Sequence, residues 1–198
     1  MRQLLFKLIF CLTIFSGSSL FADLCSSLEF RGAGFFHSSH RFREIYGNVG
    51  TSYQIEAAGN LDFCNLDCNL GWFANVDWTQ KKGRSEGLHD VTKMSIANLS
   101  FGLKYLYPFY RNYTAYAGIG PSFSRIALNN HHSHLRSHNN RYNSRIAIGG
   151  ILKTGVLYSV SCNLFLDVFV DYLYQPVSYS TNVDIGGFKL GAGIGYKF

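Results

Sequence analysis

Four of the seven histidines crowd into one short polar stretch, and they are the first residues in the chain that suggest chemistry. The stretch reads HHSHLRSH and contains His131, His132, His134 and His138. Neutral imidazole is a common ligand of Zn²⁺ and of copper, so this cluster is a candidate metal site. Its spacing matches no ordered tetrahedral pattern, and the asparagines on both sides fit a flexible polar loop equally well. Both interpretations stay open, and we expect no cofactor elsewhere.

Cysteines form the second candidate group. Cys11 lies in an N-terminal apolar run that we expect to be removed, which leaves an even number of thiols at Cys25, Cys64, Cys68 and Cys162. In an oxidising compartment an even number of thiols suggests disulfides. Cys64 could pair with Cys68 across a short turn, leaving Cys25 for Cys162. Crosslinks to neighbouring proteins and free thiols are the alternatives.

Charged residues of both signs form the third group, and they recur at alternate positions within otherwise apolar segments. Opposite charges that share a narrow interior neutralise one another, so we predict a salt-bridged plug. The residues assigned to it are Glu29, Arg31, Glu56, Asp67, Lys104, Lys153, Asp167, Asp171 and Lys189, and Asp77 and Arg145 share their face.

The elements that position these groups are eight alternating segments after residue 26, which span 28–37, 48–57, 66–78, 97–107, 113–123, 145–158, 164–174 and 187–198. An apolar residue at every second position indicates β-strands, and no segment keeps a helical period over a comparable length. Trp72 falls in the middle of its segment, away from the segment ends where an aromatic girdle would lie. Long polar connections (38–47, 79–93, 127–144 and 175–184) alternate with shorter ones near 59–65, 108–112 and 159–162.

The first residues have the layout of a secretory leader. A basic start that includes Arg2 and Lys7 precedes the apolar run LIFCLTIF, and small residues lead to Ala22. The run is shorter than the roughly 20 apolar residues of a membrane-spanning helix. We therefore expect residues 1–22 to be a cleaved signal peptide and residues 23–198 to form one domain. Cleavage would lower the formal net charge of +6 by two, and so small a surplus argues against nucleic acid as a partner.

These patterns predict an all-β fold, an eight-stranded antiparallel up-and-down β-barrel that spans a membrane. Tilted spanning strands need about 9–11 residues and are joined by long loops on one side and short turns on the other. A soluble barrel is the alternative, but its outer face would carry the Lys and Glu density of a wet surface. The polar face here is instead rich in Gly, Ser and Asn, and aromatic residues gather near the segment ends, as an interfacial girdle requires.

The chain resembles the small eight-stranded outer-membrane proteins of Gram-negative bacteria, which include opacity-type proteins, the OmpA transmembrane domain, OmpX and OmpW. The stretch YTAYAGIGPSF (residues 113–123) carries part of this resemblance, and the final segment GFKLGAGIGYKF carries most of it. The resemblance implies an outer-membrane location and a signal for the barrel-assembly machinery at Phe188, Leu190, Tyr196 and Phe198. It names no activity.

The function expected from these features is structural or interactive. We expect no enzyme and predict surface loops made basic by residues such as Arg41, Arg43 and Arg136, which could contact lipopolysaccharide, other anionic lipids or host surface molecules. The first alternative is a narrow, OmpW-like path for small or apolar molecules. The second is a lipid A-modifying barrel enzyme using serines 38 and 39 with His37 or His40, for which no orienting third group is indicated.

Overall fold

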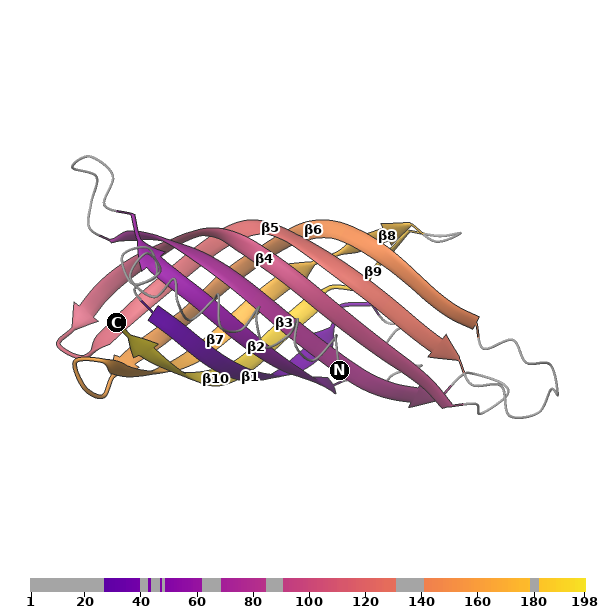
Figure 1. The fold of residues 1–198 in the computed structure, drawn as a ribbon, viewed down its shortest axis with the longest axis horizontal. Coiled ribbons are helices and arrows are strands. Elements are labelled where there is room, and N and C mark those ends of the chain that lie inside the picture. The colour runs from indigo at the N-terminus through magenta and orange to yellow at the C-terminus, as the bar shows by residue number, and fades with distance from the viewer. Residues whose placement is uncertain are drawn as a thin grey trace, which may run out of the picture.

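A single barrel accounts for most of the chain (Figure 1). The structure is a computed structural model, and it describes residues 27–39, 43, 47, 49–61, 69–84, 91–130, 141–178 and 182–198. The barrel strands are β1 (Ser27–His37), β2 (Val49–Asn60), β3 (Leu70–Arg84), β4 (Val91–Tyr110), β5 (Tyr113–Asn130), β6 (Arg141–Ser159), β7 (Leu164–Tyr174) and β10 (Gly187–Lys197). The short strands β8 (Pro176–Ser178) and β9 (Asn182–Asp184) form a separate hairpin between β7 and β10.

The sheet closes by pairing its first and last strands. β1 and β10 run antiparallel along their whole length, with Phe30 opposite Ile194 and Arg31 opposite Gly193. Every other barrel strand pairs with its neighbours along the chain, which gives the order β1-β10-β7-β6-β5-β4-β3-β2. Closure leaves the barrel sheet without an exposed edge. The predicted eight-stranded antiparallel barrel is confirmed.

Several strands are longer than the sequence pattern indicated. β3 has 15 residues, and β4, β5 and β6 have 20, 18 and 19. Backbone pairing runs into two of the long predicted loops, as far as Arg84 opposite Val91 and Asn130 opposite Arg141. A ladder of backbone hydrogen bonds does not require apolar side chains, so it continues past the point where the apolar alternation fades. In Figure 1, β4, β5 and β6 project toward the right-hand end, while the C-terminus lies at the left.

Side chains alternate between the two faces of the wall as predicted. Apolar side chains such as Ile55, Val76 and Val168 point outward and are 47%, 56% and 61% exposed, while the charged residues between them are buried inside. Trp72 is the third residue of β3 rather than a mid-strand residue, so it lies near a strand end. The described residues include no helix long and apolar enough to cross a membrane.

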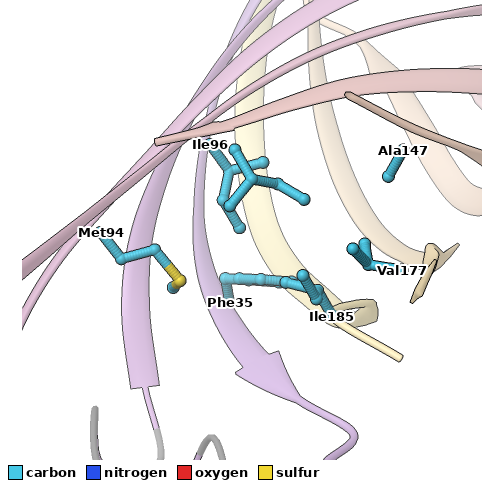
Figure 2. Close-up of a cluster of buried hydrophobic side chains, with 7 residues drawn as sticks. Phe35, Met94, Ile96, Ala147, Val177 and Ile185 are labelled. Carbon is cyan, nitrogen blue, oxygen red and sulfur yellow. The ribbon is translucent and has the colours of Figure 1, made fainter. Parts of the chain in front are cut away.

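The interior also contains apolar groups that the predicted polar plug did not include. At the end where the long strands project, Phe35, Met94, Ile96, Ile126, Ala147, Val177 and Ile185 form a buried cluster. Figure 2 shows Phe35 reaching toward Ile185, with Met94 and Ile96 beside them. Val177 and Ile185 come from β8 and from the residue after β9, so the segment between β7 and β10 contributes two apolar side chains to this cluster.

Candidate functional site in the barrel lumen

Arg31 is the centre of a buried ion-pair network. Its side chain points inward from β1, and its guanidinium Nε lies 3.0 Å from Glu29 Oε1. The Nη1 atom lies 3.1 Å from Glu56 Oε2 and 3.3 Å from Asp171 Oδ2. A second terminal nitrogen contacts Asp167. One planar donor fork therefore serves four carboxyl groups from three strands, a geometry that arginine provides and lysine does not.

Space for this guanidinium comes from a glycine on the neighbouring strand. Gly193 of β10 lies between Arg31 and Asp167 in the pairing row. A Cβ atom at Gly193 would lie 2.4 Å from Glu29 Oε1 and 2.9 Å from Arg31 Cγ, so any side chain there would displace the network. The guanidinium carbon also lies 3.8 Å from the centre of the Phe169 ring, which provides a cation–π contact.

Glu56 of β2 connects Arg31 to two lysines. Its Oε1 lies 2.5 Å from Lys104 Nζ and its Oε2 lies 2.9 Å from Lys153 Nζ. Lys153 in turn reaches Asp171 Oδ2 at 3.0 Å. All of these side chains are at most 5% exposed. Because each charge is taken out of water, each needs its partners, and removal of one member would leave the others uncompensated.

Tyr116 of β5 completes the network from the opposite wall. Its hydroxyl accepts a hydrogen bond from Arg31 and donates to Asp167 Oδ2 at 2.9 Å. The ammonium of Lys104 lies 4.1 Å from the centre of its ring. A phenol suits this position because its ring packs in the apolar wall while its hydroxyl joins the charges.

A second hydrogen-bonded network lies closer to the apolar cluster around Phe35 and Met94 and contains fewer charged groups. Lys189 Nζ donates to Asp77 Oδ2 at 2.7 Å, and the Asn98 amide donates to the same oxygen at 2.8 Å. Ser122 and Ser124 donate to Asn98 Oδ1 at 2.6 and 2.8 Å. Gln175 then donates to Ser122 at 2.7 Å, which ties the end of β7 to the wall formed by β4 and β5.

One part of the lumen wall is polar but lacks protein partners. The buried side chains of Ser52, Gln54, Asn75 and Ser100, on the adjacent strands β2, β3 and β4, have polar atoms with no hydrogen-bond partner within the described residues. Buried polar groups in folded proteins are almost always satisfied, commonly by ordered water. The polar atoms on this wall therefore need hydrogen-bond partners other than the described protein groups.

The short-turn end of the lumen contains a cavity of about 210 Å³. Residues from all eight barrel strands line it. Glu29, Glu56 and Lys104 form its inner end, while Leu106, Leu157 and Phe165 contribute apolar walls. The lumen thus contains a buried apolar cluster toward one end, ion pairs in the middle and a cavity at the other end.

The structure brings together most of the residues assigned to the plug. Glu29, Arg31, Glu56, Lys104, Lys153, Asp167 and Asp171 form the first network, and Lys189 joins the second through Asp77. Arg145 shares their face but is exposed at a strand end. The remaining plug residue, Asp67, lies outside the described residues.

Several other predicted residues also lie outside the described part of the chain. They are residues 1–22, the thiols Cys25, Cys64 and Cys68, and the histidines His131, His132, His134 and His138. The Cys162 thiol is exposed and free in the turn between β6 and β7. The leader, the disulfides and the metal site therefore stay predictions. The residues assigned to the assembly signal, Phe188, Leu190, Tyr196 and Phe198, are about half or more exposed on the outer face.

Ser38 and His37, two of the residues considered for lipid chemistry, are both described, and the Ser38 hydroxyl contacts groups other than the imidazole. Ser38 Oγ lies 3.2 Å from Asp184 Oδ2 and 2.9 Å from the Gly186 carbonyl oxygen. His37 is 4% exposed and its ring packs edge-on against Phe35. The hydroxyl therefore ties β1 to the segment between β9 and β10, which is a structural use.

Sequence reasoning missed the aromatic and amide members of the lumen. Phe165 and Phe169 alternate with Asp167 and Asp171 along β7, so the same two-residue period that placed the carboxylates inside also places these rings inside. Gln175, which joins the second network, follows the last residue of β7 and keeps the same alternation. The alternation therefore indicated that these residues face inward, but an apolar residue on the polar face was not interpreted as part of the lumen packing.

Eight antiparallel strands close around an ion-paired lumen, and their outer face is apolar and suited to lipid. These features define a small outer-membrane β-barrel protein. Residues 61–198 match the family model described as Opacity family porin protein. The chain belongs to this Opacity family. By the usual orientation of such barrels, the short turns face the periplasm and the long strands project outside the cell.

Solved structures agree on the fold. Neisserial surface protein A (NspA) is 21% identical, with 87% of this chain and 96% of that chain covered and a TM-score of 0.63. The outer-membrane protein OprG from Pseudomonas aeruginosa is 13% identical, with 88% and 96% covered and a TM-score of 0.56. At these identities the similarity shows the fold alone. No curated protein sequence matches this chain.

Proposed function

We propose that the protein works at the cell surface, where its outer rim binds anionic polymers, with the sulfated glycans of a host surface as the target class. The supporting observation is a set of cations at the outer strand ends. Arg125 on β5 and Arg145 on β6 are exposed, Arg43 is exposed before β2, and Lys81 on β3 donates to the Gly47 carbonyl oxygen at 2.8 Å.

The described carboxylate at this rim has structural partners. Asp184 accepts hydrogen bonds from the backbone amides of Gln175 and Gly186 at 3.0 and 2.9 Å through Oδ1, and from Ser38 through Oδ2. It thereby holds the β8–β9 hairpin in place. Asp184 stays negatively charged, but among the described side chains the cations at this rim outnumber it, so the rim presents a positive field that attracts an anionic polymer and weakens as salt screens it.

Replacing Arg125 and Arg145 together with serine is expected to lower the affinity for heparin, used as a sulfated probe, by about tenfold or more. Each cation near an anionic surface contributes roughly 1 kcal/mol, and a 1.4 kcal/mol loss is tenfold. Binding of barrel-containing vesicles to immobilised heparin measures the effect, with neutral dextran as the control surface.

Lys197→Ser is the matched control variant because Lys197 lies at the opposite end of the barrel. It should bind heparin as the unmodified protein does. Equal heparin binding by the double variant, or binding that does not fall as NaCl rises, would contradict the proposal.

The filled lumen leads us to expect no stable channel. Arg31 and its partners occupy the centre, and the apolar cluster around Phe35 and Met94 lies toward the outer end. Eight strands leave an interior that side chains fill, whereas open aqueous pores need about 16. Planar-bilayer recordings should show no reproducible conductance steps, with an open porin as the positive control. Uniform steps that scale with protein concentration would favour the narrow transport alternative.

Two further assignments belong to this proposal. The outward row of Phe188, Leu190, Tyr196 and Phe198 on and beside β10 would serve as the signal that the barrel-assembly machinery reads, which the family resemblance and the half-exposed rings support. Lipopolysaccharide phosphates would meet the same outer cations as the glycan, because both ligands present dense negative charge.

A further inference from the structure

Two buried carboxyl groups meet at one nitrogen atom of Arg31. Glu29 Oε1 and Asp167 Oδ2 each lie 3.0 Å from the Nε atom. The two residues come from β1 and β7, are 3% and 1% exposed, and lie within hydrogen-bonding reach of each other. Two negative charges held this close and away from water repel each other strongly, so such a pair commonly keeps one proton. The contact therefore favours one protonated and one ionised carboxyl group.

Glu29 is the carboxyl group of the network with the least compensation from cations. Both lysines of the network, Lys104 and Lys153, contact Glu56, at 2.5 and 2.9 Å. Among the described residues, the cation in contact with Glu29 is Arg31, which also serves the other three carboxyl groups. The network thus has four carboxyl groups against three cations, and one bound proton makes it neutral.

Lys189 and Lys197 also face the lumen or its cavity, but within the described residues neither forms an ion pair with Glu29. Lys189 lies 2.7 Å from Asp77 in the second network. Lys197 is exposed at the end of β10, and its Nζ atom lies 5.7 Å from the centre of the Phe165 ring. An exposed ammonium group keeps its water and is screened by salt, so it compensates a carboxylate that it does not contact only weakly.

The hydrogen bonds of Asp167 indicate which carboxyl group of the pair is ionised. Its Oδ2 atom accepts from Arg31 and from the Tyr116 hydroxyl, and such donors favour a carboxylate. Its Oδ1 atom is buried and has no hydrogen-bond partner within the described residues, so it needs a donor. The Oδ1 atom of Asp171 also lacks a partner there, but of these two groups Asp167 is the one within reach of Glu29.

We propose that the lumen holds one bound proton, which Glu29 carries and donates in a hydrogen bond to Asp167. Oε1 of Glu29 accepts from Arg31, so the proton is on Oε2 and points to Asp167 Oδ1. The proton comes from water at the periplasmic end, where Glu29 lines the cavity, and no other bond changes. This site is separate from the outer rim and does not depend on glycan binding.

The bound proton makes the stability of the barrel depend on periplasmic pH. In the unfolded chain the side chain of Glu29 is in water and ionised at neutral pH, so folding takes up one proton. Stability therefore falls as the pH rises, by up to about tenfold in the folding equilibrium constant for each pH unit. The decline ends at the pH where the folded barrel also loses the proton.

The first test compares Glu29→Gln with Glu56→Gln in the refolded full-length barrel. An amide has the shape of a protonated carboxyl group and can donate the same hydrogen bond. At neutral pH the urea midpoint of Glu29→Gln should equal or exceed that of the unmodified barrel, and the difference should widen as the pH rises. Glu56→Gln is the matched control. It removes a charge that three cations share, so the folding equilibrium constant should fall by about a hundredfold or more.

Infrared spectra locate the proton in a barrel that is isotope-labelled in its glutamate side-chain carboxyl groups. At neutral pH we expect a C=O band of protonated glutamate that is absent from Glu29→Gln and unchanged in Lys197→Gln. A midpoint for Glu29→Gln below that of the unmodified barrel would overturn the proposal, and so would a band that appears only after Lys197 is replaced. If Glu29→Gln does not fold, the labelled unmodified barrel still decides. The absence of a protonated band, or a band without the isotope shift, would refute a proton on Glu29.

Discussion

Arg31→Met should lower the free energy of unfolding by about 3–5 kcal/mol, the range measured when one partner of a buried ion pair is removed. The side chain of Arg31 is fully buried and contacts Glu29, Glu56, Asp167 and Asp171. Methionine fills much of the volume but leaves these carboxyl groups facing one another without the cation. Urea unfolding of the refolded barrel, monitored by the fluorescence of Trp72 and Trp78, measures the change.

Two variants separate the charge effect from a general effect of mutation. Arg125→Met removes an exposed arginine and should change stability by less than about 0.5 kcal/mol. Arg31→Met combined with Asp167→Asn should recover part of the loss, because one of the unpaired charges is then gone. An unfolding midpoint for Arg31→Met equal to that of the unmodified barrel would show that the ion pairs are not needed for stability.

The sequence predicted which residues face inward but not which of them meet. Asp167 and Asp171 are placed inside by the alternation of β7 alone, and Arg31 by the alternation of β1. Their contact depends on barrel closure, because β10 lies between these strands and Gly193 sets the row that joins Arg31 to Asp167. Such pairing is a property of the register around the whole barrel, and 136 residues of sequence separate the partners.

The sequence pattern also did not predict the cavity or the buried apolar cluster toward the outer end. Val177 lies in the predicted polar connection 175–184 and Ile185 directly follows it, yet both side chains belong to the buried cluster that contains Met94 and Ile96. The cavity exists because the inward residues near the turns, such as Gly59 and Gly71, are small. Alternation gives the side of the wall on which a residue lies, whereas the volume left inside depends on how opposite walls fill the lumen.

Val168→Arg should destabilise the barrel in lipid vesicles by about 2–4 kcal/mol, the cost of a cation on the lipid face near the bilayer midplane. Val168 lies in the middle of β7, points outward and is 61% exposed. The same substitution on the outside of a soluble barrel would cost little, because water would solvate the guanidinium. Unfolding in vesicles of defined composition measures the effect.

Asn163→Arg is the matched control, because Asn163 lies in the exposed turn between β6 and β7, where the added charge reaches water and where water replaces the lost hydrogen bond to the Lys197 carbonyl oxygen. We therefore expect the unmodified barrel and Asn163→Arg to be equally stable and Val168→Arg to be less stable than both. Detergent micelles deform around a charge more readily than a bilayer does. In micelles the difference in unfolding free energy between the two variants should therefore be smaller. Equal stability of both variants in vesicles would contradict the position of Val168 in the hydrocarbon layer, and with it the depth assigned to β7.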